Sequence, residues 1–96
     1  MMILITYDVD TTSVSGKRRL RKVAKECVNY GRRVQNSVFE CLLTDAQFVL
    51  LRSILESIID EKIDSVRFYF LGNNWNNRIE YIGKNTTFAI DSELII

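Results

Sequence analysis

The sequence predicts a single α+β domain in which two helices pack against one face of an antiparallel sheet. Two segments have the spacing of amphipathic helices, and they alternate with short apolar segments rich in β-branched and aromatic residues. The order is strand, helix, one or two strands, helix, strand and further strands, which is the ferredoxin-like βαββαβ plan with C-terminal additions. With 96 residues, the chain is near the common size of one small domain. We expect that domain to span residues 1–82.

The first strand and the first helix follow one another closely. Ile3–Val9 is apolar on both faces, which is typical of a central strand. The strand meets negative charge at Asp8, and a second carboxylate follows at Asp10. The next segment predicts a helix that stops at Gly31, with an apolar stripe at helical spacing formed by Leu20, Val23, Ala24, Cys27 and Val28.

An extended segment and a second helix come next. The segment RRVQNSVFECLL, residues 32–43, forms either one bent strand or a tight two-strand hairpin, because its alternation breaks near Asn36 and Ser37. Thr44 and Gln47 predict a capping box at the start of the second helix. The apolar face of that helix consists of Phe48, Leu51, Leu55, Ile58 and Ile59.

The last predicted elements are strands. SVRFYFLG, residues 65–72, alternates so that Val66, Phe68 and Phe70 face one way and Tyr69 and Leu71 the other. A short strand is predicted at Ile79–Ile82, and the tail at 83–96 is again apolar and β-prone.

The predicted plan leaves one face of the sheet without helices. Several strands nevertheless carry apolar residues on both sides, and a second copy of the chain is the simplest cover for the open face. We therefore expect a homodimer packed through the sheet faces. The tail at 83–96 is expected to dock on the partner subunit as an added strand.

The composition excludes several kinds of site. The chain has no histidine, which excludes an imidazole base, Ser-His and Cys-His nucleophiles and histidine-containing metal sites. Cys27 and Cys41 lie in apolar patterns without C-x-x-C spacing, which favours free buried thiols in a reducing cytoplasm over a disulfide or a metal pair. No segment approaches the roughly 20 apolar residues of a membrane span, so we expect a cytoplasmic protein with no membrane partner.

The charge is strongly uneven although the net charge is only +1. Between Gly16 and Arg33 there are eight basic residues and one acidic residue, a net charge of +7. Such a segment favours a polyanionic partner over a merely solvated helix face. The candidates for nucleic-acid binding are Lys17, Arg18, Arg19, Arg21, Lys22 and Arg33.

Asp8 has two interpretations at the end of a central strand. One is structural, since a carboxylate there balances the dipole of the helix that follows. The other requires the dimer, because a residue at that position can lie near the two-fold axis, opposite its own copy. Two carboxylates within about 5 Å must share a proton or a cation. Oxygen-only ligands select a hard ion, Mg²⁺ or alternatively Mn²⁺.

Several motifs together resemble one known family. The segments ITYDVD, KRRLRKVAKEC and above all YGRRVQNSVFEC are similar to the CRISPR-associated protein two family, the small non-integrase member of the spacer-acquisition pair. The resemblance covers essentially the whole chain. The segments LITYDV and LGNN look most like the branch found with bacterial type I-C systems.

The resemblance implies a ferredoxin-like homodimer with metal-dependent endonuclease activity on single-stranded RNA or double-stranded DNA. It also implies an adaptor role, in which the dimer bridges the integrase subunits and holds spacer DNA. The metal-binding catalytic aspartate of the family maps onto Asp8, and Tyr7 matches before it. The remaining matched positions are Arg33, a phosphate contact, together with Gln35, Ser37 and Phe39. Tyr7, Ser37 and Phe39 are expected to support the site or the interface.

Two other functions remain open from the sequence. The dimer could be a non-catalytic scaffold that carries DNA across its basic helices and bridges integrase dimers. A toxin-type ribonuclease shares the same architecture. Neighbouring genes for an integrase and a repeat array would decide against the toxin.

Overall fold

The computed structural model describes residues 1–72 and 79–84. The predictions for the tail beyond residue 84 therefore lie outside the described residues. The elements are β1 (Met2–Asp8), α1 (Val14–Cys27), β2 (Gly31–Gln35), β3 (Val38–Leu42), α2 (Asp45–Ile58), β4 (Ser65–Leu71) and β5 (Ile79–Gly83).

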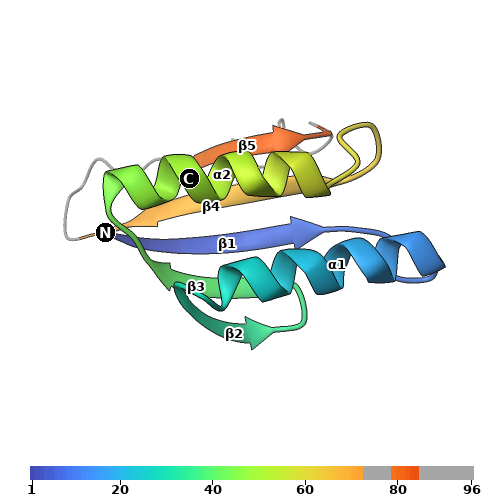
Figure 1. The fold of residues 1–96 in the computed structure, drawn as a ribbon, viewed down its shortest axis with the longest axis horizontal. Helices are drawn as coiled ribbons and strands as arrows, with labels where there is room; N and C mark the ends of the chain where they lie inside the picture. The colour runs from blue at the N-terminus through green and yellow to red at the C-terminus, as the bar shows by residue number, and fades with distance from the viewer. Residues whose placement is uncertain (73–78, 85–96) are drawn as a thin grey trace, which may run out of the picture.

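The strands form one antiparallel sheet in the order β2-β3-β1-β4-β5. Both helices lie over the same face of this sheet (Figure 1). The ferredoxin-like prediction is confirmed, with β1 in the centre and β5 as an added edge strand. In the register of β1 and β4, Asp8 lies opposite Ser65 at the end of β1.

Both helices begin at polar caps. The Ser13 hydroxyl accepts a hydrogen bond of 3.0 Å from the Gly16 amide at the start of α1. Thr44 and Gln47 form the predicted capping box of α2, with reciprocal hydrogen bonds of 2.9 and 3.1 Å.

The segment at 32–43 forms a two-strand hairpin of β2 and β3. The prediction that Gly31 stops the first helix is wrong, since α1 ends at Cys27 and Gly31 begins β2. Glycine is required there by the neighbouring strand, because a Cβ atom would lie 1.8 Å from the carbonyl oxygen of Glu40.

The core fills the space between the sheet and the helices. The predicted stripe of α1 is buried except for Val28, which caps the helix and is 44% exposed. The assignment of Val28 to the stripe was therefore wrong, because the chain leaves the helix before that residue can turn inward. Phe48 of α2 packs edge-on against Phe68 and Phe70 of β4, as the alternation predicted. Cys27 and Cys41 are free and buried, as predicted.

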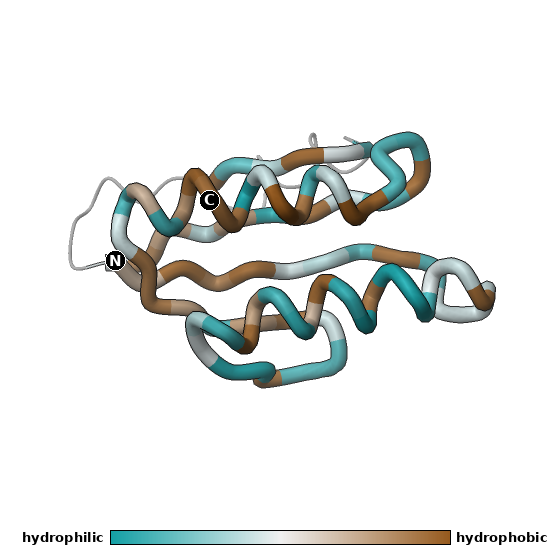
Figure 2. The backbone as a smooth tube through the Cα atoms, viewed as in Figure 1, coloured by the Kyte–Doolittle hydropathy of each residue, from teal (hydrophilic) through white to brown (hydrophobic). Residues whose placement is uncertain are grey.

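The other face of the sheet carries no helix, and its character changes along β1. Side chains alternate, so Ile3, Ile5 and Tyr7 face the helices while Leu4 and Asp8 point to the open side. The beginning of β1 is hydrophobic and the strand becomes more polar toward Asp8 (Figure 2). At the apolar end, an in-register row of exposed side chains crosses three strands, formed by Leu42, Met2 and Leu71.

Candidate functional site

Asp8 lies on the open face where β1 ends, and its side chain is exposed. The backbone there is fixed on both sides. Asp8 is paired with Ser65 of β4, and the amide of Tyr7 donates a hydrogen bond of 2.9 Å to the Ser37 carbonyl in the β2–β3 turn. The carboxylate is thus presented to solvent from a position held by β4 on one side and by the β2–β3 turn on the other.

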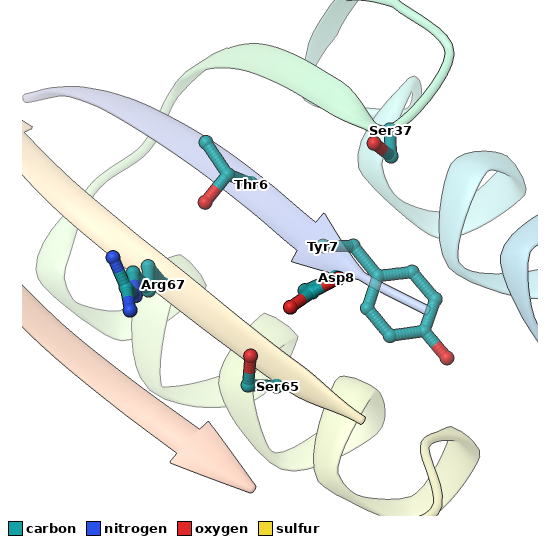
Figure 3. Close-up of a pocket in the computed structure, with 6 residues that line it drawn as sticks. All are labelled: Thr6, Tyr7, Asp8, Ser37, Ser65 and Arg67. Carbon is teal, nitrogen blue, oxygen red and sulfur yellow. The ribbon is translucent and has the colours of Figure 1, made fainter. Parts of the chain in front are cut away.

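A hollow of about 300 Å³ surrounds this position. Figure 3 shows the Asp8 carboxylate on the same side as Ser65 and Arg67, while the Tyr7 hydroxyl points away from them. The hollow is lined by Thr6, Tyr7, Asp8, Ser37, Ser65 and Arg67. One carboxylate, three hydroxyls and one guanidinium therefore share an open pocket, which suits a phosphate group and a hard cation better than an apolar ligand.

The chemistry of these donors is compatible with Mg²⁺ or Mn²⁺, because oxygen ligands are preferred by both ions. One chain contributes a single carboxylate to the hollow. Within residues 1–72 and 79–84, no group of three or more His, Cys, Asp or Glu side chains could hold a metal ion. The site is therefore complete only with further ligands from water, phosphate or a second copy of the chain.

A buried ion pair lies on the helix side of the same end of the sheet. Asp64, the residue before β4, is fully buried. Its carboxylate accepts hydrogen bonds from Arg19 Nε at 2.7 Å and Arg19 Nη2 at 3.1 Å, from the Tyr7 hydroxyl at 2.5 Å and from the Asp60 amide at 3.1 Å. Burial alone would raise the pKa of Asp64, but these donors outweigh it and hold the pKa below the ordinary value of 3.8.

This ion pair predicts a loss of stability in acid. The lowered pKa of Asp64 stabilises the fold above the ordinary pKa, and this contribution is lost as the pH falls through the pKa of the folded state. Asp64→Asn should lower the free energy of unfolding by about 2–3 kcal/mol at pH 7 and flatten the dependence of Tm on pH below about pH 4. Thermal unfolding between pH 2 and 7 measures both effects.

Asp10→Asn is the matched control for that experiment. The pKa of Asp10 is also lowered, by the Thr12 hydroxyl and amide, but its side chain is exposed. Removing its charge should change stability far less than Asp64→Asn does. Equal effects of the two substitutions would contradict the role given to Asp64.

The predicted cations of α1 are mostly exposed, and the structure brings two of them close to the β2–β3 turn. A second hollow, of about 360 Å³, is lined by Thr11, Lys17, Leu20, Arg21, Arg33 and Asn36. Arg33 is held there by a hydrogen bond of 2.7 Å from its Nε to the Asn36 carbonyl, and its guanidinium lies 5.7 Å from the centre of the Phe39 ring. Arg18 and Lys22 are exposed elsewhere on α1.

Arg19 differs from the other predicted cations. Its guanidinium is engaged with Asp64 in two hydrogen bonds, and its side chain is only 16% exposed. Its expected place on the nucleic-acid surface therefore does not agree with its contacts. Its pKa is raised by those hydrogen bonds, so it stays charged as a partner of Asp64.

Two of the three supporting residues lie in the core. Tyr7 is 2% exposed and Phe39 is fully buried, and both face the helices. Core packing was one of the two places expected for them, and neither lies on the open sheet face. Ser37 is half-buried and lines the hollow of Asp8.

Sequence reasoning missed Arg67, Ser65 and Asp64. For Arg67 and Ser65 a signal existed, because the alternation in SVRFYF places both on the face opposite Phe68, which is the face of Asp8. For Asp64 there was none, since a charged residue before a strand is usually solvated.

The comparisons with known proteins address the family directly. The family model described as CRISPR associated protein Cas2 matches residues 1–79. The chain belongs to the Cas2 family. It is 52% identical over 96 residues to a Chlorobaculum tepidum protein named CRISPR-associated endoribonuclease Cas2, and the match covers the whole of both chains. It is 53% identical over 95 residues, 99% of each chain, to a Halalkalibacterium halodurans protein named CRISPR-associated endonuclease Cas2.

A solved structure named Cas2 agrees with this membership, and a second solved structure is similar in fold. The crystal structure of Streptococcus pyogenes Cas2 at pH 6.5 is similar with a TM-score of 0.75 and 63% identity, covering 78% of this chain and 90% of that one. A hypothetical protein from Thermus thermophilus has a TM-score of 0.64 and 33% identity, covering 75% and 82%. In the described part of the chain, no helix is both long and apolar enough to cross a membrane.

Proposed function

We propose that this Cas2-family protein is a metal-dependent endonuclease that hydrolyses phosphodiester bonds during CRISPR adaptation, with Asp8 as its catalytic and metal-binding residue. The observation that carries the proposal is the exposed Asp8 carboxylate at the polar end of β1, in a hollow that also holds Ser65 and Arg67. Relatives 52% and 53% identical over essentially the whole chain are named endoribonuclease and endonuclease.

Each group in the hollow has a defined part in such a reaction. A hard divalent ion, Mg²⁺ or Mn²⁺, would be held by Asp8, and when bound it lowers the pKa of water and stabilises charge on a phosphodiester. Arg67 carries a positive charge suited to a phosphate oxygen, and the hydroxyls of Thr6 and Ser65 donate hydrogen bonds to the same group. The cations of the second hollow seat the nucleic-acid backbone without reading its sequence.

The first test is cleavage by the purified protein on single-stranded RNA and on double-stranded DNA. Cleavage should require Mg²⁺ or Mn²⁺ and should stop when a chelator is added, because the chain lacks histidine and its hollow has a single carboxylate. Both substrates are included because the relatives' names differ between endoribonuclease and endonuclease. Cleavage that continues in excess chelator would contradict the proposal.

We infer that the active form is a homodimer packed through the open sheet faces. The row of Leu42, Met2 and Leu71 leaves apolar side chains in water, and a second copy would cover them. In such a dimer each chain supplies one Asp8, so two carboxylates can share one ion. The tail at 83–96 is proposed to add to the partner subunit.

A lysine in that row should dissociate the dimer. Leu42→Lys places a charge that would have to be buried at the interface, so the dimer dissociation constant should rise at least about 100-fold. Val49→Lys is the matched control, since Val49 on α2 is 66% exposed and Leu42 is 65% exposed. Sedimentation equilibrium at micromolar concentration should find wild type and Val49→Lys as dimers and Leu42→Lys as monomers. A monomeric wild type would contradict the dimer.

The exposed cations of α1 support a second role, as an adaptor that holds spacer DNA and contacts the CRISPR integrase subunits. Lys17, Arg18, Arg21 and Lys22 are exposed on α1, so this surface is free to follow a DNA backbone.

We further propose that the protein belongs to the type I-C branch, because the segments LITYDV and LGNN resemble that branch. We also propose a cytoplasmic location, because the two buried thiols are free. Sequencing the neighbouring genes tests the branch.

A further inference from the structure

The buried carboxylate of Asp64 lies directly behind the proposed site. On the open side of the sheet, Asp8 and Ser65 are paired across β1 and β4. On the helix side, the residues before each of them are linked by the 2.5 Å hydrogen bond from the Tyr7 hydroxyl to Asp64. Asp8 and Ser65, which line the hollow, therefore each directly follow a residue of a buried network, Tyr7 and Asp64 respectively.

This network joins four segments of the chain. Arg19 of α1 contributes two parallel hydrogen bonds to Asp64, and the Asp60 amide in the α2–β4 loop contributes another. The backbone of Asp64 is also fixed, because its carbonyl oxygen accepts a hydrogen bond of 2.7 Å from the Lys84 amide after β5. Gly83, with φ +92°, allows that approach, since a Cβ atom would lie 2.3 Å from the same oxygen.

We propose that Asp64, Tyr7 and Arg19 form a positioning network that fixes the direction of the Asp8 carboxylate. This inference rests on the proposed function of Asp8 as the metal-binding residue. Tyr7 cannot rotate or shift without leaving a wholly buried carboxylate short of a donor. The backbone of residues 7–8 is therefore held on the helix side of the sheet by the hydrogen bond of the Tyr7 hydroxyl to Asp64. It is held within the sheet by the hydrogen bond of the Tyr7 amide to the Ser37 carbonyl.

Positioning differs from simple stabilisation in what it predicts for metal binding. A substitution that only destabilises the fold lowers the amount of folded protein and leaves the affinity of that protein for the ion unchanged. A substitution that frees the backbone under Asp8 weakens metal binding in the folded protein. Residues that orient a ligand from behind typically change metal affinity by about 10-fold to 100-fold.

The test uses Tyr7→Phe, which keeps the ring in the core and removes only the hydroxyl, and Arg19→Gln as a second variant. Arg52→Gln is the control, because Arg52 forms another ion pair of the fold, with Glu80 between α2 and β5, and neither residue lines the hollow of Asp8. Mn²⁺ binding to the purified protein is measured by electron paramagnetic resonance without nucleic acid. Amide hydrogen exchange at residue 7 and at Lys84 is measured without metal.

We expect Tyr7→Phe and Arg19→Gln each to weaken Mn²⁺ binding about 10-fold and to speed exchange at both amides, while Arg52→Gln changes neither. If Asp8→Asn abolishes Mn²⁺ binding but both network variants bind as wild type does, the positioning role is overturned and the proposed function stands. If Asp8→Asn leaves Mn²⁺ binding unchanged, the proposed metal site fails. In that case amide hydrogen exchange alone tests the network, and unchanged exchange at residue 7 and Lys84 in Tyr7→Phe would overturn it.

Discussion

Asp8→Asn is expected to lower the rate of phosphodiester cleavage about 100-fold to 1,000-fold. Asparagine keeps the shape of the side chain and removes the charge that would hold the ion, and charge stabilisation by a bound metal contributes several kcal/mol to such a transition state. Because Asp8 is exposed on the open face and lies outside the buried core, the variant should fold as wild type does. Initial rates at saturating Mg²⁺ on RNA and DNA substrates measure the effect.

Two controls make this result specific to Asp8. Asp10→Asn removes another exposed carboxylate two residues away, whose oxygen is engaged by Thr12, and it should retain wild-type cleavage. The preparation of Asp8→Asn also reveals any contaminating nuclease, which would cleave equally in both samples. Undiminished cleavage by Asp8→Asn in a preparation free of contaminants would mean that Asp8 does not hold the ion.

The architecture could be predicted because local patterns and global packing agree. The alternation in SVRFYF placed Phe68 on the helix side, and Phe68 does pack against α2. The capping box at Thr44 marked the start of α2 to within one residue. For residues 32–43 the sequence did not decide between one bent strand and a hairpin. The pairing of β2 with β3 shifts register between Arg33 and Gln35, and this irregularity hides the alternation of the two strands.

The position of Asp8 could also be predicted, since a charged residue at the end of a central strand must lie where that strand leaves the core. The pairing of Arg19 could not. On the helix, Arg19 adjoins Lys17, Arg18 and Arg21 in sequence, and nothing in that run distinguishes it. Its partner Asp64 is 45 residues away in the sequence and is fully buried in the folded chain. A contact of this kind is decided by tertiary packing.

The resulting distribution of charge separates two tasks on one small domain. Asp64 neutralises Arg19 inside the fold, so the remaining cations of α1 act outward. Asp8 sits on the opposite face of the sheet, among hydroxyls and Arg67. A nucleic acid bound along α1 and the β2–β3 turn would therefore be held by one surface, while the reaction proposed at Asp8 would take place at another.

The double charge reversal Lys17→Glu with Arg21→Glu is expected to weaken nucleic-acid binding about 100-fold at moderate salt. Both residues line the hollow that Arg33 shares, so two phosphate contacts are lost and repulsion replaces them. Each ionic contact with duplex DNA contributes about 0.9 to the slope of log affinity against log salt concentration, so that slope should fall by about 2. Fluorescence anisotropy with short duplexes over a range of salt concentrations measures affinity and slope together.

The control for this variant must change net charge equally. Lys62→Glu with Lys84→Glu reverses two exposed charges in the α2–β4 loop and after β5, and β5 is the sheet edge opposite β2. If binding depends on the particular cations of the hollow, this control should lose little affinity and keep its salt slope. If both double variants weaken binding equally, only the overall field of the protein attracts nucleic acid, and the hollow formed by α1 and the β2–β3 turn is not the site where the backbone lies.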